Sequence, residues 1–300
     1  MDARITKLDV EKFSSLRCGG TLNRVVMPKS VEEIIDFCQY FCGEEKVVIG
    51  GLSNTLVLSG GVDKLCLFTK QLMGITIDNE VLEVSSGESL VKIAQVAQSN
   101  CLSGLEPLCG IPGTVGGAVF GNSGSFNGEI GELVESIKLV DLSNGQIEEL
   151  SREEIGFLYR KTVLRKGKDM IYSIKLRLLP DSGNEIALRM ARIRAMRKKS
   201  QPGNPSLGCV FKKCEGISAG YYIEKAGLKG YEENRMQFSP IHANFIINKG
   251  GTPEDYLTLV ELAEKAVYEK LGKKLVREVN IIGEPSNKEF NSRGTAFSGD

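Results

Sequence analysis

Residues 105–131 read LEPLCGIPGTVGGAVFGNSGSFNGEIG. It holds eight glycines and only one charged residue before Glu129. Closely spaced glycines let the backbone adopt positive φ angles and let another group approach the main chain. Their amides can converge on an anion, whereas Pro112 removes one donor and stiffens the turn. The stretch is therefore either a phosphate-binding loop or a tight structural turn, and its residues alone leave both interpretations open.

A second glycine turn, Gly50-Gly51-Leu52-Ser53-Asn54, follows a predicted strand at residues 46–49. A capping-box pattern at Ser30 predicts a helix before that strand, running to about Phe41. A β-α-β unit with a glycine turn is typical of half a nucleotide site. The G-x-G-x-x-G spacing and the G-x-x-x-x-G-K-[ST] pattern are both absent, which disfavours a Rossmann fold and a P-loop.

The composition indicates an ordinary soluble globular protein. The 300 residues suit two medium domains or one large domain with an appendage. Lys+Arg 38 against Asp+Glu 38 gives no formal net charge, which argues against nucleic acid or an anionic membrane as a partner. No apolar run approaches a membrane span, and residues 1–4 do not begin a signal peptide. We expect a cytoplasmic monomer.

The cysteine pattern argues against a metal site. The chain has eight cysteines and one histidine, His242, and no C-x-x-C pair. Zinc and iron–sulfur sites need denser clusters of these residues, so we expect no metal. In a cytosolic protein such cysteines are mostly free, buried thiols.

Several further elements follow from local signals. Ser143-Asn144-Gly145 predicts a hairpin between two strands, a capping box begins a helix after Ser151, and Thr252-Pro253-Glu254-Asp255 caps a helix that ends at Leu271-Gly272. A basic helix is expected from Glu185 to Lys199, either as a solvated face or with Arg192 or Arg194 meeting phosphate. Residues 15–28 indicate a short strand broken by glycines, residues 200–208 a crossing between domains, and the polar tail from 286 disorder.

Taken together, these motifs resemble those of the UDP-N-acetylenolpyruvoylglucosamine reductase family, in its short form. The resemblance runs from about residue 16 to residue 283. Its most specific segments occur in the family's order: GIPGTVGGA at 110–118, Tyr159-Arg160, Asn204-Pro205-Ser206 with 208–212, His242-Ala243-Asn244-Phe245, and Glu278-Val279.

The resemblance implies an α+β protein with two domains. An FAD-binding domain of the PCMH type (the vanillyl-alcohol-oxidase group) would span 1–182, with lobes at about 1–70 and 71–182. A C-terminal α/β substrate-binding domain would span 183–285, followed by a disordered tail at 286–300. Both glycine turns would line the FAD diphosphate. The implied cofactor-binding residues are Gly50, Gly51, Ser53, Asn54, Gly110, Ile111, Pro112, Gly113, Thr114, Gly116, Gly117, Ala118 and Asn122.

The implied reaction has two halves. NADPH reduces the flavin, and the enolpyruvyl ether of UDP-N-acetylglucosamine then accepts hydride to give UDP-N-acetylmuramate for peptidoglycan synthesis. Charge that develops into the substrate carboxylate needs a fixed cation, a proton donor and a further polarising group. The matching residues are Arg160, Cys209 and Glu278 respectively. Residues implied to bind substrate are Tyr159, Lys212, Tyr221, His242 and Asn244.

The chain departs from the family pattern at Cys209 and Leu52, and to a lesser extent at Cys214 and at Gln237-Phe238-Ser239. Cys209 stands where the family has serine as the proton donor, and a thiol is a far stronger acid than an alcohol. A nearby arginine could leave part of it as thiolate, which cannot donate. Leu52 stands where the family has a third glycine, so the turn there could be less open.

Two other functions fit parts of the same pattern. A PCMH-type oxidase of an alcohol or sugar would share the diphosphate turns without needing Arg160, Cys209 and Glu278 together. A flavin- or UDP-sugar-binding protein that has lost its chemistry would be expected to differ at Leu52 and Cys209. An anaerobic titration with NADPH and then the enolpyruvyl nucleotide distinguishes all three.

Overall fold

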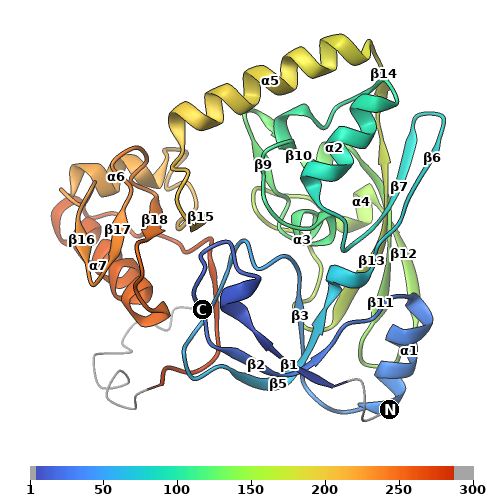
Figure 1. The fold of residues 1–300 in the computed structure, drawn as a ribbon, viewed down its shortest axis with the longest axis horizontal. Helices are drawn as coiled ribbons and strands as arrows, with labels where there is room; N and C mark the ends of the chain where they lie inside the picture. Colours follow the sequence, from blue (N-terminus) through green and yellow to red (C-terminus); the bar gives the residue numbers. More distant parts are fainter. Residues whose placement is uncertain (1–4, 287–300) are drawn as a thin grey trace. The chain divides into compact units, whose positions relative to one another are not determined.

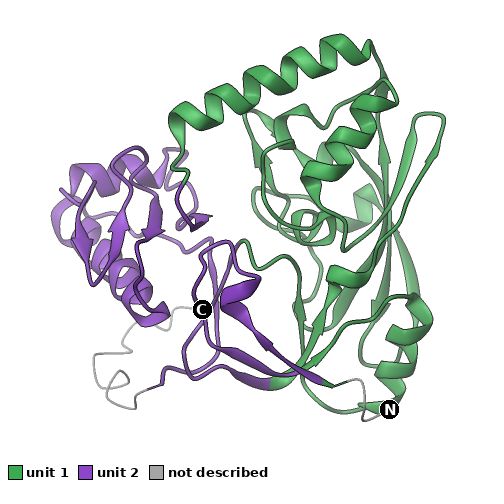
Figure 2. Cartoon of the chain, in the orientation of Figure 1, with its two compact units in different colours: residues 1–5, 25–53, 64–203 green, residues 6–24, 54–63, 204–300 purple. Residues whose placement is uncertain are grey.

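The computed structural model describes residues 5–286, so all but the first residue of the predicted tail lies outside the described part. The chain forms two compact units (Figure 2). Unit 1 contains residues 1–5, 25–53 and 64–203, and unit 2 contains residues 6–24, 54–63 and 204–300. The units are interleaved along the sequence, and the predicted domain boundary at residue 182 stays a prediction.

The main sheet of unit 1 is antiparallel, with strand order β12-β11-β13-β7-β6 (Figure 1). The predicted hairpin at 143–145 is confirmed, because β11 and β12 pair from Ser136 with Ser151 to Val140 with Ile147. The strands of this sheet are β6 (Ile75–Asp78), β7 (Val81–Ser85), β11 (Val134–Asp141), β12 (Ile147–Ser151) and β13 (Asp169–Arg177).

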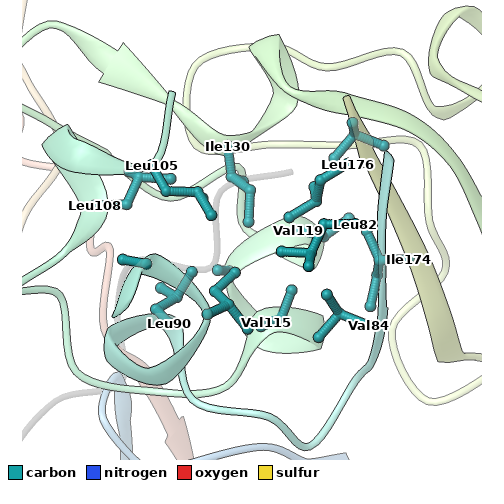
Figure 3. Packing of buried hydrophobic residues seen from close by; sticks show 14 of the residues in the cluster. Leu82, Val84, Leu90, Leu105, Leu108, Val115, Val119, Ile130, Ile174 and Leu176 are labelled. Atoms are coloured by element: carbon teal, nitrogen blue, oxygen red, sulfur yellow. The ribbon is translucent and has the colours of Figure 1, made fainter. Parts of the chain in front are cut away.

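The central core of unit 1 lies between this sheet and two helices (Figure 3). Helix α2 (Leu90–Ser99) buries Leu90, Ile93, Ala94 and Ala97, the face predicted from the 3.6-residue period. Helix α3 (Val115–Phe120) contacts β7 and β13. Val115 and Val119 of α3 pack with Leu82 and Val84 of β7. The glycine-rich stretch is therefore fixed at one end by an apolar core.

Within the described residues, the rest of unit 1 consists of three further α-helices, two neighbouring parallel strands that belong to a four-stranded sheet, and short elements. Strand β3 (Lys46–Ile49) pairs in parallel with the second part of β5 (Val62–Phe68), and α1 (Val31–Tyr40) packs beside them. Helices α4 (Arg152–Ile155) and α5 (Gly183–Ser200) follow β12 and β13. The short strands are β8 (Leu102–Ser103), β9 (Gly124–Ser125), β10 (Gly128–Glu129) and β14 (Leu179–Pro180).

Unit 2 contains an antiparallel sheet of order β15-β18-β17-β16 and a separate parallel pair. The sheet strands are β15 (Ser206–Cys209), β16 (Glu232–Glu233), β17 (Met236–Phe238) and β18 (Phe245–Asn248). Helices α6 (Ala219–Lys225) and α7 (Pro253–Leu271) pack on its core. The parallel pair is β4 (Thr55–Val57) with β19 (Asn280–Ile282).

One predicted strand is shorter than expected. Within residues 15–28, only β2 (Thr21–Val26) is a strand, and β1 (Thr6–Asp9) precedes it. Gly19 has a φ of 153°, and a Cβ on Gly20 would lie 2.1 Å from the carbonyl oxygen of Leu58. These glycines therefore allow a close backbone approach rather than a continuous strand. Within the described part of the chain, no helix is long and apolar enough to cross a membrane.

Candidate active site

The two glycine turns, separated by about sixty residues in sequence, meet within unit 1. A Cβ on Gly51 would lie 3.0 Å from the Cα of Gly113 and 3.3 Å from the nitrogen of Thr114. A Cβ on Gly50 would lie 2.9 Å from the Oγ1 of Thr114. Gly113 has a φ of 123°, and its absent side chain would meet Ser53 Oγ at 2.6 Å. Glycine is therefore needed here for packing of one turn against the other.

Several amides of the 110–118 loop are already used by the protein. The backbone nitrogens of Val115 and Gly116 donate to the carbonyl oxygens of Glu88 and Ser86, at 2.8 and 2.9 Å. Thr114 is the N-cap of α3 and accepts from Gly117 N at 3.3 Å. These bonds hold the loop against the segment between β7 and α2. An anion at this loop would accordingly be met by other amides of the two turns.

Asn122 is a structural centre of the glycine-rich stretch. Its side chain is 2% exposed, and its φ of 43° lies in the left-handed region. Its Nδ2 donates to Glu129 Oε2 at 2.8 Å and to the Leu158 carbonyl at 3.0 Å, and its Oδ1 accepts from Gly131 N at 3.1 Å. The amide thus ties the 121–131 segment to the loop that carries Arg160. A direct contact of Asn122 with FAD stays a prediction.

Arg160 lies in a tight turn between Leu158 and Lys161, whose backbones exchange two hydrogen bonds of 2.9 and 3.1 Å. Its φ is 53°, and its side chain is 19% exposed. The guanidinium donates to the carbonyl oxygens of Asn122 and Gly124 at 3.1 and 2.7 Å, and to Glu129 Oε1 at 3.3 Å. Its carbon also lies 5.1 Å from the centre of the Tyr159 ring. Arg160 is therefore a fixed cation beside the glycine-rich stretch, and its predicted contact with the substrate carboxylate stays a prediction.

Two arginines of the basic helix α5 that the sequence did not single out contact the stretch. Arg189 donates to Glu106 Oε1 at 2.8 and 2.9 Å. Arg197 donates to Ser125 Oγ at 2.8 Å, and a Cβ on Gly110 would meet its Nε at 2.7 Å. The 3.6-residue period puts 189, 193 and 197 on one helix face, so this pair could have been found from the spacing.

Burial and hydrogen bonding act in opposite directions on Glu106. Burial would raise the pKa of this carboxyl group, but bonds from the backbone amides of Gly104 and Glu106 and from Arg189 and Ser103 hold it below its usual value. The carboxylate accepts from Gly104 N at 2.6 Å and from Ser103 Oγ at 2.9 Å. The start of the glycine-rich stretch is thereby anchored to α5.

In unit 2, Cys209 is the last residue of β15 and is half-buried. It pairs with Phe245 of β18, and Gly208 before it has a φ of 78°. Asn244 fixes the residues that follow Cys209. The carbonyl oxygen of Asn244 accepts from Val210 N at 2.8 Å, and its side-chain amide both accepts from Phe211 N at 3.0 Å and donates to Phe211 O at 2.8 Å.

Glu278 lies on the segment next to Cys209. Its backbone nitrogen donates to the carbonyl oxygen of Val210 at 2.8 Å, which places the backbone of Glu278 beside the residue that follows Cys209. The amide of Asn54 donates to the Glu278 carbonyl at 3.1 Å, and the carbonyl of Asn54 accepts from Asn280 N at 3.0 Å. Asn54 therefore fixes the backbone of Glu278, a role that its position in a glycine turn did not indicate.

The other predicted substrate residues of unit 2 differ in environment. His242 is partly buried, its Nδ1 accepts from Asn244 N at 3.3 Å, and its ring packs against Phe245. Burial lowers the pKa of His242, and Lys229 lowers it further, so the ring is neutral at pH 7. Tyr221 is exposed on α6, with Lys225 Nζ 5.7 Å from its ring centre. Lys212 is placed by its backbone nitrogen, which donates to Val276 O at 2.8 Å.

The predicted site residues divide between the two units. Unit 1 holds Gly50, Gly51 and Ser53, the 110–118 loop, and the Asn122, Tyr159 and Arg160 group. Unit 2 holds Asn54, Cys209, Lys212, Tyr221, His242, Asn244 and Glu278. Among residues 5–286, no cluster of three or more His, Cys, Asp or Glu side chains could hold a metal ion.

Comparisons with known proteins agree with this arrangement. An FAD-binding-domain family matches residues 22–151, and the C-terminal domain of UDP-N-acetylenolpyruvoylglucosamine reductase matches residues 200–282. The reductase of Streptococcus pneumoniae strain JJA is 35% identical over 283 residues, covering 93% of each chain. That of strain 70585 is 35% identical over 280 residues, covering 92% of each.

A solved structure of the same kind covers both units. The crystal structure of the reductase from Thermus caldophilus is 33% identical, with a TM-score of 0.80, and covers 93% of this chain and 98% of its own. The predicted fold, an FAD-binding domain of the PCMH type with a C-terminal substrate-binding domain, is thereby confirmed. The chain belongs to the UDP-N-acetylenolpyruvoylglucosamine reductase family.

Proposed function

We propose that this chain uses FAD and NADPH to reduce the enolpyruvyl group of UDP-N-acetyl-3-O-(1-carboxyvinyl)-glucosamine to the lactyl ether of UDP-N-acetylmuramate, with Arg160, Cys209 and Glu278 as its catalytic residues. The observation that carries the proposal is the meeting of the two glycine turns at Gly51 and Gly113, with no room for a Cβ. Family membership supports the same reaction.

The residues present fit an FAD diphosphate. The 50–53 and 110–114 turns bring main chain to main chain, with Ser53 Oγ and Thr114 Oγ1 between them. Such glycine turns provide amide donors without side chains that would exclude an anion. No lysine or arginine belongs to either turn, so recognition there would depend on backbone and hydroxyl donors. When bound, FAD would supply hydride to the substrate, after taking it from NADPH.

Arg160 is proposed to bind and polarise the substrate carboxylate. Hydride addition to the terminal carbon of the enolpyruvyl group makes the neighbouring carbon electron-rich, and the charge spreads into the carboxylate as an enolate. A cation whose position is already fixed stabilises this charge without reorganisation. The bonds from Arg160 to Asn122, Gly124 and Glu129 provide that fixed position. A planar guanidinium also matches a carboxylate in two hydrogen bonds.

Cys209 is proposed to give the proton that completes the reaction. Its S–H bond breaks as a C–H bond forms at the enolate carbon, and the electron pair stays on sulfur as thiolate. The bonds from Asn244 to Val210 and Phe211 hold the backbone that follows Cys209, which supports a fixed position for the proton donor. Glu278, held next to Val210, would orient or polarise the carboxylate as its protonated or hydrogen-bonded form. The enzyme is proposed to act as a cytoplasmic monomer.

An anaerobic two-step titration tests this function. The purified protein should carry the visible absorption of oxidised FAD, lose it on addition of NADPH, and regain it on addition of the enolpyruvyl nucleotide. Cys209→Ala should bleach with NADPH at the wild-type rate, because the thiol has no part in flavin reduction, and should fail to regain the oxidised band. A protein without FAD would exclude the function, and normal turnover by Cys209→Ala would exclude only the role of Cys209.

A further inference from the structure

Tyr256 of α7 has a buried hydroxyl group for which the structure gives no hydrogen-bond partner among the described residues. Its side chain is 0% exposed and packs in the core of unit 2 with Val210 and Phe211. A buried hydroxyl without a partner lowers stability, and phenylalanine would fill the same space without that penalty. The hydroxyl therefore calls for a functional explanation.

Three segments of unit 2 converge around this side chain. The segment at 15–18 lies against the sheet, because Ser206 N of β15 donates to Ser15 O at 3.2 Å and Asn248 Nδ2 of β18 donates to Leu16 O at 2.9 Å. Val210, which follows Cys209, belongs to the same core cluster as Tyr256, and Cys18 packs against that cluster. Cys18 and Val210, the residue bonded in sequence to Cys209, thus both pack in the core that buries the phenol.

The electrostatics of Tyr256 agree with this placement. Burial raises its pKa, and the thiols of Cys18 and Cys209 raise it further, so the phenol stays protonated at neutral pH. Burial also raises the pKa of Cys18 to about 12, with Glu11, Glu254 and Asp255 adding to the effect. Cys18 therefore remains a neutral thiol. Of the two thiols, only Cys209 is converted to an anion by the reaction proposed above.

We propose that Tyr256 is a positioning residue for Cys209, whose hydroxyl donates a hydrogen bond to the Cys209 sulfur as the thiol gives up its proton. The phenol keeps its own O–H bond throughout, and the thiolate is later reprotonated by water. The inference rests on the proposed role of Cys209. It also explains how a cysteine can serve at this position, since a donor that meets the thiolate makes proton release easier.

The test compares Tyr256→Phe with Tyr268→Phe, which removes an exposed hydroxyl from the same helix. In Tyr256→Phe, reoxidation of the NADPH-reduced flavin by the enolpyruvyl nucleotide should slow about ten- to a hundredfold, the range expected for a hydrogen bond to a charged group. Flavin reduction by NADPH should keep its wild-type rate. Tyr268→Phe should behave as wild type in both steps.

A second readout reports on the sulfur itself. The pH dependence of Cys209 alkylation, followed on its own peptide by mass spectrometry, should shift by about one to two pH units upward in Tyr256→Phe, because the thiolate loses a donor. Equal slowing of both half-reactions, or an unchanged alkylation profile, would overturn the inference. Normal turnover by Cys209→Ala would instead remove the proposed role of Cys209, so the two failures are distinguishable.

Discussion

The contact between Gly51 and Gly113 makes a sharp prediction at the scale of one residue. A Cβ on Gly51 would lie 3.0 Å from the Gly113 Cα, and backbone cannot move aside as a flexible side chain can. Gly51→Ala should therefore separate the two turns and weaken FAD binding by tenfold or more, roughly 1–2 kcal/mol. Fluorescence titration of the apoprotein with FAD measures this.

Gly203→Ala is the matched control, because no atom lies within 4 Å of the position that its Cβ would occupy. It should bind FAD as the wild type does. Equal affinities in both variants would show that the turns do not depend on the close approach.

The backbone conformation of Leu52 accounts for the glycine that the family pattern has at this position, whereas its side chain adds buried apolar surface. Its φ is 51°, a left-handed conformation that strains any side chain with a Cβ, yet it is only 2% exposed. Leu52→Ala should lower the free energy of unfolding by about 2–4 kcal/mol, since it loses buried surface and keeps the strain. Leu52→Gly should be about 1 kcal/mol more stable than Leu52→Ala. Urea unfolding of both variants tests whether the backbone at position 52 is strained, because at an ordinary φ the alanine variant would be the more stable of the two.

At the scale of elements, the sequence predicted what local signals determine. The capping box predicted at Ser151 is confirmed with both reciprocal bonds, and the cap predicted at Thr252 is confirmed and is also a full capping box with Asp255. At Ser30 the hydroxyl oxygen accepts from the backbone nitrogen of Glu33, as predicted. The Glu33 carboxylate, however, accepts from the backbone nitrogen of Lys29 and not from that of Ser30. The meeting of the two glycine turns and the role of Asn54 depend on chain folding over long separations, which no local pattern encodes.

The anchor between Glu106 and α5 predicts a pH dependence. The folded-state pKa of Glu106 is lowered, so its contribution is present above the unfolded pKa of about 4.3 and is lost as pH falls through the folded value. Glu106→Gln should cost about 1–3 kcal/mol at pH 7, because Arg189 and the Gly104 amide lose a charged partner. The difference between variant and wild type should shrink below pH 4.

Thermal unfolding at pH 7 and at acidic pH measures this difference. Glu185→Gln, on the exposed side of the first turn of α5, is the control. It should change the free energy of unfolding by no more than about 0.5 kcal/mol at either pH. A Glu106→Gln penalty that stays constant down to pH 3 would contradict the assignment.

For the whole molecule, the interleaving of the units predicts how the chain unfolds. The chain passes between the units after residues 5, 24, 53, 63 and 203, and the boundary divides β2 and β5 within single strands. A strand divided in this way cannot lose its order in one unit without disturbing the other. The chain should therefore unfold in one cooperative transition, unlike two domains joined by one linker.

FAD should shift this transition as a whole. A ligand that binds only the folded state, present at a free concentration of about 100 times its dissociation constant, stabilises that state by about 2.7 kcal/mol. Calorimetry with and without FAD should show a single peak that moves to higher temperature, and far-ultraviolet dichroism should give the same midpoint. Gly51→Ala, in which the contact with Gly113 is disturbed, should need more FAD for an equal shift. Two resolved transitions, of which FAD moves only one, would mean that the units fold independently despite the strands they share.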